Sequence, residues 1–212
     1  MTGPNNHSPH GKGASTAHIA PLADDELASV QDIVDLARKF SGYVPTSFRI
    51  MARKPTLLRA FNGLVAAVMR DAGELPADLK WLIAHAVSAS AGCRYCQAHT
   101  AANSAKAGLP VAKIEALMEY DTSAVYSPPE RAAVALALAA GQVPNASTRE
   151  HFHALRLHFS DTAIVEIVAV ISLFGWLNRW NDTLASDLEP APLGFASTHL
   201  GPSGWAPGKH AR

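Results

Sequence analysis

The sequence predicts an all-α fold, and three observations support this. Of the 212 residues, 48% are hydrophobic but only 7% are aromatic, so Ala, Leu, Val and Ile must build most of the core. Apolar residues recur at helical spacing along most of the chain, and no convincing run alternates apolar and polar residues as a half-buried strand does. A chain of this length fits one domain, or one domain with tails.

Helix start and stop signals divide the first half of the chain. Residues 24–40 begin with acidic side chains, which suit the positive end of a helix dipole. Residues 55–73 open with Pro55, a favoured residue in a first helical turn. Between these two stretches we expect a short helix at residues 46–53, and after them a helix at residues 76–91.

The second half continues in the same way. Further helices are expected at residues 93–108, 110–120, 127–142, 147–159 and 160–185. Ser127 is a suitable cap for the third of these, and a left-handed Gly108 ends the first. The longest apolar run, "AIVEIVAVISLFGWL", is shorter than the ~20 residues of a spanning helix and contains Glu166, so it is read as a buried helix.

We expect three regions along the chain. Residues 1–20 are rich in Gly, Pro, Ser, Asn and His, which predicts a disordered tail. Residues 21–190 are predicted to form a single all-helical domain. Residues 191–212 form a Pro/Gly-rich C-terminal extension, whose Phe195 and Trp205 indicate that it lies against the body or a neighbouring subunit.

Charge and composition exclude several classes of partner. Lys plus Arg and Asp plus Glu both number 18, so no overall field attracts nucleic acid or an anionic membrane, and neither partner is expected. The N-terminus lacks the basic start and apolar stretch of a secretory signal, which predicts a cytoplasmic protein. No haem, flavin or nucleotide motif is visible, so no cofactor is expected.

The candidate site is "CRYCQAH", which holds the only two cysteines of the chain. Steps of three residues on a helix place Cys93, Cys96 and His99 across about 120° of one surface. Gly92 breaks the preceding helix, so Cys93 opens the next one, where free N–H groups and the helix dipole favour a thiolate. His99 then serves as a proton acceptor or relay for one of the thiols.

Two other interpretations of these residues stay open. The cysteines could simply fill an alanine-rich core, with His99 at the surface. Alternatively, Cys93, Cys96 and His99 could supply three ligands of a metal site, with water or His85 as the fourth.

The stretch "LPADLKWLIAHAVSASAGCRYCQAHTAANSAKAGL", residues 75–109, resembles the alkylhydroperoxidase D-like and carboxymuconolactone decarboxylase family. "SPPERAAVALALA", "HFSDTAIVEIVAVISLFGWLNRWNDTL" and "LEP" resemble its C-terminal helices. The resemblance implies a helical bundle of the alkylhydroperoxidase D-like type, assembled as a homotrimer or homohexamer. It also implies a thiol-dependent peroxidase or dithiol-disulfide oxidoreductase, in which Cys96 attacks a hydroperoxide, Cys93 resolves the product and an external dithiol restores both.

This chain departs from the pattern of the peroxidase members at two places. Two residues, rather than three, separate Cys96 from His99. Those members also carry a glutamate twelve positions before the first cysteine, where this chain has Trp81. His85 lies one helical turn after Trp81, and we offer it as the substitute for the missing carboxylate in the proton relay. The alternative is that His85 is a core or interface histidine held by one hydrogen bond.

Two alternative functions remain open from the sequence. One is a cofactor-free decarboxylase or lactone-type enzyme of the carboxymuconolactone decarboxylase branch. The other is a non-catalytic redox sensor, in which a slow dithiol reports oxidants without turning them over.

Overall fold

The computed structural model describes residues 15–211, and within that range every regular element is helical, which confirms the all-α prediction. Residues 1–14, most of the expected disordered tail, lie outside the described residues. The principal helices are α1 (Gln31–Ser41), α2 (Thr46–Met51), α3 (Pro55–Val65), α4 (Ala77–Ala91), α5 (Arg94–Lys106), α6 (Val111–Glu115), α7 (Pro128–Ala140), α8 (Arg149–Arg156), α9 (Asp161–Leu184) and α10 (Pro190–His199).

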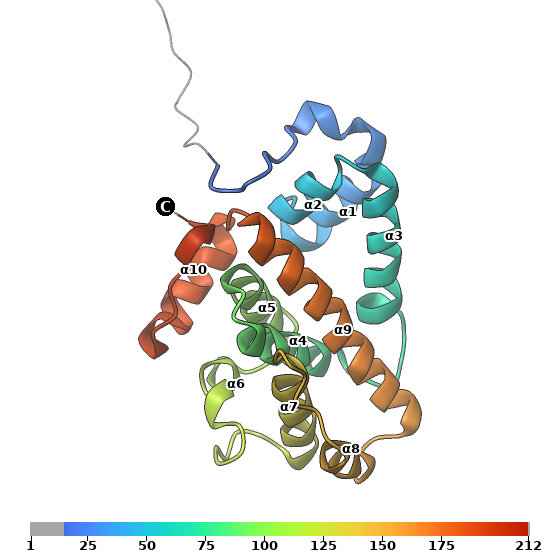
Figure 1. The fold of residues 1–212 in the computed structure, drawn as a ribbon, viewed down its shortest axis with the longest axis vertical. Coiled ribbons are helices and arrows are strands. Elements are labelled where there is room, and N and C mark those ends of the chain that lie inside the picture. Colours follow the sequence, from blue (N-terminus) through green and yellow to red (C-terminus); the bar gives the residue numbers. More distant parts are fainter. Residues whose placement is uncertain (1–14, 212) are drawn as a thin grey trace, which may run out of the picture.

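Helix α4 lies at the centre of the domain. It packs against α5, α7 and α9, and its side chains are buried on all sides, including Leu82, Ile83, His85 and Val87. A helix that is apolar around its whole circumference must be enclosed by other elements. Figure 1 shows the result: α9 runs diagonally across the molecule, with α1 to α3 on one side and α7 and α8 on the other.

Glu166 lies within the apolar run of α9, and its carboxylate is held by several partners. Its two carboxylate oxygens accept the backbone N–H groups of Glu74 and Leu75 at 2.9 and 3.1 Å, and one of them lies 3.9 Å from Lys80 Nζ. Lys80 is itself almost completely buried. Glu166 therefore pairs with α4 and fixes the loop before it, because buried polar groups must find partners.

Among the described residues, α9 is long and apolar enough to cross a membrane. Less than half of its most apolar window is buried, yet it packs along α4 and α5 and carries Asn178 and Asn181 among its buried residues. The core helix of a globular domain has the same properties, so this helix is weak evidence for a span.

Two expected helices differ in detail from the structure. Residues 24–40 do not form one helix: Asp24–Val30 is a 3-10 turn, and α1 begins only at Gln31, because Val30 departs from helical geometry with φ −132° and ψ 26°. The helix that starts at Pro55 ends in a wider π turn, Ala66–Arg70, before extended Asp71. Such turns are frequent at functional sites, and this one borders the cavity described below.

The segment after α9 is more regular than its Pro/Gly content indicates. Residues 190–199 form α10, which packs on α5, and two short 3-10 turns follow, Gly201–Ser203 and Gly208–His210. Leu200 and Trp205 are buried against the core. This arrangement brings the C-terminal part of the chain to the helix that carries both cysteines (Figure 1).

Candidate active site

Cys93 is the N-cap of α5. Gly92 adopts the left-handed conformation, φ 75°, that ends α4, and Cys93 follows with extended backbone. Its Sγ accepts the backbone N–H of Cys96 at 3.5 Å. Only a residue without a side chain adopts the Gly92 conformation freely, so the Ala91-Gly92 break directly places Cys93 at the positive end of α5.

The two thiols have opposite environments although both are buried and reduced. The hydrogen bond from Cys96 lowers the pKa of Cys93, burial acts against it, and His210 lowers it further, to about 6. Burial and the neighbouring Cys93 raise the pKa of Cys96 well above its ordinary value. Cys93 is therefore the sulfur that carries the charge near neutral pH.

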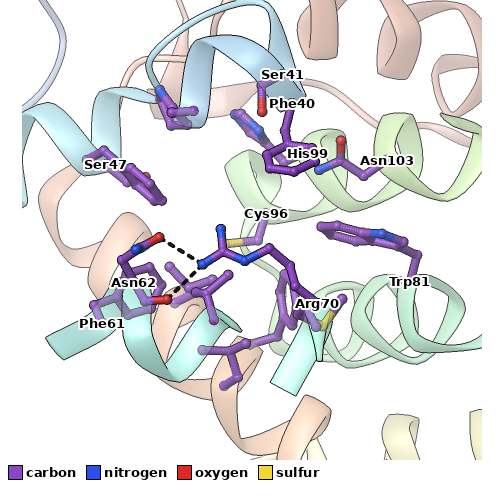
Figure 2. Close-up of a pocket in the computed structure, with 18 of the residues that line it drawn as sticks. Phe40, Ser41, Ser47, Phe61, Asn62, Arg70, Trp81, Cys96, His99 and Asn103 are labelled. Atoms are coloured by element: carbon purple, nitrogen blue, oxygen red, sulfur yellow. Dashed lines mark hydrogen bonds between the residues drawn. The ribbon is translucent and has the colours of Figure 1, made fainter. Parts of the chain in front are cut away.

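Cys96, unlike Cys93, lines a cavity of about 380 Å³ that opens between α1, α3, α5 and α9. Figure 2 shows its sulfur at the cavity wall, with Trp81, His99 and Arg70 around it. Other apolar and aromatic lining residues are Phe40, Phe48, Phe61, Val65, Phe174 and Leu177. A largely apolar cavity with a few polar groups is the usual form of a small-molecule site.

His99 also lines this cavity and belongs to a hydrogen-bonded group of four side chains. Its Nε2 lies 2.6 Å from Glu189 Oε2, and its Nδ1 lies 3.3 Å from the Tyr43 hydroxyl. The Tyr95 hydroxyl and the backbone N–H of Thr46 donate to Glu189 Oε1 at 3.1 and 2.5 Å. Nε2 therefore faces the carboxylate of Glu189, and Nδ1 is the ring nitrogen on the side of the Tyr43 hydroxyl.

Glu189 is the N-cap of α10, where the helix dipole favours a negative charge. Burial acts to raise the pKa of Glu189, but the charge and hydrogen bond of His99 outweigh it, together with the N–H of Thr46, and the pKa lies below its usual range. Glu189, which is not among the residues that line the cavity, thus places a carboxylate in contact with His99. Trp81 supplies no carboxylate to this group of residues.

His85 occupies a different place from the one expected for a relay. It is not among the residues that line the cavity, and its Nδ1 lies 3.1 Å from Thr100 Oγ1. Thr100 in turn donates to the backbone carbonyl of Cys96 at 2.7 Å. Burial lowers the pKa of His85 to about 4, so the ring is neutral and supports the turn of α5 that carries Cys96.

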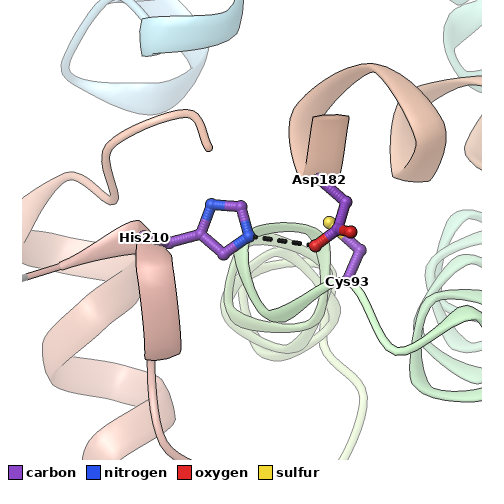
Figure 3. A group of neighbouring side chains, drawn as sticks. All are labelled: Cys93, Asp182 and His210. Atoms are coloured by element: carbon purple, nitrogen blue, oxygen red, sulfur yellow. Dashed lines mark ion pairs between the residues drawn. The ribbon is translucent and has the colours of Figure 1, made fainter. Parts of the chain in front are cut away.

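A second histidine and carboxylate lie beside Cys93. Cys93 Sγ, Asp182 and His210 have ligand-type atoms that all lie within 4.8 Å of one another (Figure 3). These side chains are of types that can hold a metal ion, and they come from α5, α9 and the C-terminal turn. The three metal ligands considered from the sequence, Cys93, Cys96 and His99, do not form such a group, because His99 faces Glu189.

Sequence reasoning therefore placed these three residues on the helix where the structure has them, but it missed several of their partners. Cys93, Cys96 and His99 lie on α5 as expected, and Cys96 and His99 share the cavity. It missed Glu189, Tyr43, Asp182 and His210. Glu189 had a usable signal, since a carboxylate directly before Pro190 is typical of a helix N-terminus. His210, in "GKH" near the chain end, had none.

Comparison with known proteins identifies the family. The model of the carboxymuconolactone decarboxylase family matches residues 55–139. The chain is also 31% identical to a solved structure of the debrominase Bmp8, a cysteine-to-alanine variant in complex with 2,3,4-tribromopyrrole; the match covers 85% of this chain and 96% of that one, with a TM-score of 0.80. The protein belongs to the carboxymuconolactone decarboxylase family.

Two peroxidase-related proteins share the fold. An uncharacterised peroxidase-related protein from Ralstonia eutropha JMP134, described as an alkylhydroperoxidase AhpD core, is 25% identical over 82% of this chain and 90% of its own, with a TM-score of 0.69. A peroxidase-related protein from Silicibacter sp. TM1040 is 20% identical over 86% and 96%, with a TM-score of 0.75, and shows the fold alone. No curated protein matches the chain.

Proposed function

We propose that the protein is a thiol-dependent peroxidase that reduces organic hydroperoxides with the Cys93 and Cys96 pair. One observation carries the proposal: the Cys96 sulfur lies at the wall of an apolar cavity that it shares with His99, while Cys93, one turn away, is held as a thiolate. The overall reaction converts one hydroperoxide and two thiols into an alcohol, water and a disulfide.

The first step takes place in the cavity. Cys96 Sγ attacks the terminal oxygen of the hydroperoxide as its proton passes to His99, and the O–O bond breaks. His99 gives that proton to the departing alkoxide, which leaves as the alcohol. Cys96 is oxidised to a sulfenic acid. Glu189 stabilises the imidazolium that forms between these two transfers, in the way a charged carboxylate supports a catalytic histidine.

The second step joins the two sulfurs. The Cys93 thiolate attacks the Cys96 sulfur, an S–S bond forms, and the S–O bond breaks. The hydroxide that leaves takes the proton that Cys93 had given up and becomes water. Because Cys93 is already ionised and lies one helical turn from Cys96, this step needs little movement of the backbone.

The lining of the cavity supports an apolar organic hydroperoxide as the substrate. Aromatic side chains, Phe61, Trp81 and Phe174 among them, enclose the space in front of Cys96. Burying the organic part of a substrate there removes apolar surface from water, which hydrogen peroxide cannot offer. We propose an external dithiol as the reductant, since the disulfide must be opened by thiol exchange after each turnover.

We also propose that the protein works in the cytoplasm as a homotrimer or homohexamer. Support comes from α9, whose outer surface exposes apolar side chains, including Val165, Val168 and Trp176. Apolar residues gathered on one helix face are typical of a contact surface. Light scattering on the purified protein measures the assembly directly, and a monomer at working concentration would contradict it.

The peroxidase proposal is tested by adding one equivalent of cumene hydroperoxide to the reduced protein and following the thiols by mass spectrometry. The parent should lose both thiols to an intramolecular disulfide. Cys93→Ser should stop at a sulfenic acid on Cys96, trapped with dimedone, and Cys96→Ser should not react. A sulfenic acid on Cys93 in the Cys96→Ser variant would reverse the order, and two inert thiols would favour the decarboxylase or sensor alternatives.

A second candidate is reductive debromination of an aromatic ring. The match to the debrominase Bmp8, over 96% of that chain, and the aromatic cavity lining favour it. Here Cys96 takes the bromine from carbon, His99 delivers the thiol proton to that carbon, and Cys93 expels bromide to form the disulfide. Bromide release from 2,3,4-tribromopyrrole, in step with loss of two thiols, distinguishes this function from a peroxidase that leaves the bromopyrrole unchanged.

A further inference from the structure

His210 comes from the last described turn of the chain and is almost completely buried, at 1% exposure. Its Nδ1 lies 2.8 Å from the backbone carbonyl of Ser186, so this nitrogen carries a proton and donates it. The backbone carbonyl of His210 accepts the N–H of Leu188 at 2.8 Å. Two bonds thus fix both the backbone and the ring of this residue.

With Nδ1 occupied, the other ring nitrogen is left for Asp182 and Cys93. Nε2 lies 3.4 Å from Asp182 Oδ1, and a ring nitrogen of His210 lies within 4.8 Å of Cys93 Sγ (Figure 3). A neutral ring would turn an unshared electron pair toward a carboxylate and a thiolate. A protonated ring instead places its N–H between two anions, which is the favourable arrangement.

The charges around His210 balance without any further ion. Lys209 Nζ lies 3.0 Å from the second oxygen of Asp182, so with a protonated His210 ring one carboxylate and one thiolate face one ammonium and one imidazolium. Burial acts to lower the pKa of His210, but the neighbouring Cys93 and the partners Ser186 and Asp182 outweigh it, and the pKa is raised. We therefore favour a proton at this position over a metal ion.

We propose that His210, oriented by Ser186 and backed by Asp182, is the acid–base partner of Cys93: it holds the proton of the Cys93 thiol and returns it to the hydroxide that leaves Cys96. The second half of this assignment rests on the proposed peroxidase function; the first half does not. In the return step the N–H bond of His210 breaks, water forms, and the ring is left neutral beside the new disulfide.

The assignment gives the two sulfurs separate histidine–carboxylate pairs. His99 and Glu189 serve the cavity side of Cys96, and His210 and Asp182 serve Cys93. One proton of the two thiols leaves with the alcohol and the other with water. Both pairs draw a residue from beyond α9, so the C-terminal segment completes the dithiol site on both sides.

The ion pair is tested without any oxidant by following thiolate absorbance at 240 nm against pH in the Cys96→Ser background. Cys93 is then the only cysteine, and tyrosines stay protonated below about pH 9. His210→Gln, which keeps a donor for the Ser186 carbonyl, should raise the Cys93 midpoint by about one pH unit or more, a tenfold change in ionisation. His199→Gln, at a histidine bonded to Glu115 on the surface, should leave it unchanged.

A reciprocal measurement guards against a variant that folds poorly. The two titrations are linked, so removing the thiolate must lower the midpoint of His210. We expect the His210 ring signal in NMR to titrate at lower pH in Cys93→Ser than in the parent. The other titratable groups that face this ring are Asp182, Lys209, Tyr95 and Cys96, and none of them changes in that variant. If neither the Cys93 midpoint in His210→Gln nor the His210 midpoint in Cys93→Ser shifts, the assignment is overturned.

The proton return is tested in the chain that keeps both cysteines. After one equivalent of cumene hydroperoxide, His210→Gln should accumulate Cys96 sulfenic acid that the parent passes on to the disulfide, with an unchanged first step. If no variant forms sulfenic acid while the Cys93 midpoint still depends on His210, the peroxidase function fails and the ion pair stands. Stoichiometric zinc binding to the reduced parent, lost in His210→Gln, would replace the acid–base role with a metal site.

Discussion

The Nε2 atom of His99 and the Oε2 atom of Glu189 lie 2.6 Å apart, although the two residues are ninety positions apart in the sequence. The carboxylate also accepts from Tyr95 and from the backbone of Thr46, so it joins α10 to α5 and to the start of α2. A charged carboxylate held by several donors fixes the orientation of the histidine before substrate arrives.

Glu189→Gln should impair catalysis more than stability. The amide oxygen still accepts from His99, but the charge that stabilises the imidazolium is lost, so kcat/KM for an organic hydroperoxide should fall about tenfold to a hundredfold. The pH midpoint of Cys93 ionisation should not change, since that sulfur lies near His210.

Glu115→Gln is the matched control for this prediction. Glu115, the last residue of α6, pairs at 2.9 Å with His199 on α10, the helix that Glu189 caps. The control should keep full activity. Equal losses in the two variants would show that Glu189 acts through the packing of α10 alone.

Substrate size should depend on the cavity in front of Cys96. Val65→Trp places a large ring in the cavity lining and should lower kcat/KM for cumene hydroperoxide by tenfold or more, with a much smaller effect on hydrogen peroxide. Met118→Trp, at an exposed methionine in the turn Leu117–Glu119, should change neither value. Equal losses for both peroxides in Val65→Trp would argue that substrate does not enter there.

His85 should make the protein less stable in mild acid. Its pKa is about 4 when folded and near 6.5 when unfolded, so between these values the unfolded chain binds more protons. Stability is therefore unaffected above about pH 6.5 and falls as pH decreases, by roughly 2 kcal/mol at pH 5.

Urea unfolding at pH 7 and pH 5 measures this contribution. His85→Gln, which can still bond to Thr100, should lose less stability between the two pH values than the parent does. His158→Gln, at an exposed histidine, should behave like the parent. A pH dependence unaltered by His85→Gln would mean that His85 is ionised in the folded protein.

Replacing Gly73 or Gly63 with alanine should change the stability of the protein in opposite directions. A methyl group on Gly73 would lie under 3 Å from the Glu166 carboxylate, which two backbone N–H groups hold in place, so Gly73→Ala should cost about 1–3 kcal/mol. Gly63 lies exposed within α3 with open space around it, and Gly63→Ala should stabilise by about 0.5–1 kcal/mol. Thermal or urea unfolding of both variants checks the contrast.

The sequence predicted most of this fold because local signals define helices. Pro55 and Ser127 begin helices, Gly92 ends one, and the long apolar run of α9 is read as a single helix from its spacing. The same local signals failed where the backbone responds to distant partners. Asp24, for example, bonds to Arg49, and this contact lies in the 3-10 turn that replaces the start of an expected helix.

The candidate site was predictable only where its residues are neighbours in the chain. Cys93, Cys96 and His99 share one helix, so spacing alone places them together. Glu189 and His210 reach the site through tertiary packing, which no local pattern records. His85 was chosen because it lies one turn from Trp81, but its face of α4 meets Thr100, and the sequence does not specify which neighbour covers which face.

The placement of Glu189 and His210 far beyond the cysteines also has a consequence in time. A ribosome makes Cys93 and Cys96 roughly a hundred residues before it makes the two side chains that tune them, and domains fold as units. While the chain is being synthesised, both thiols keep the ionisation of free cysteine and react slowly with oxidants. Under the proposed function, Cys93 gains its thiolate and Cys96 gains its histidine–carboxylate pair only once the C-terminal segment has folded against α5.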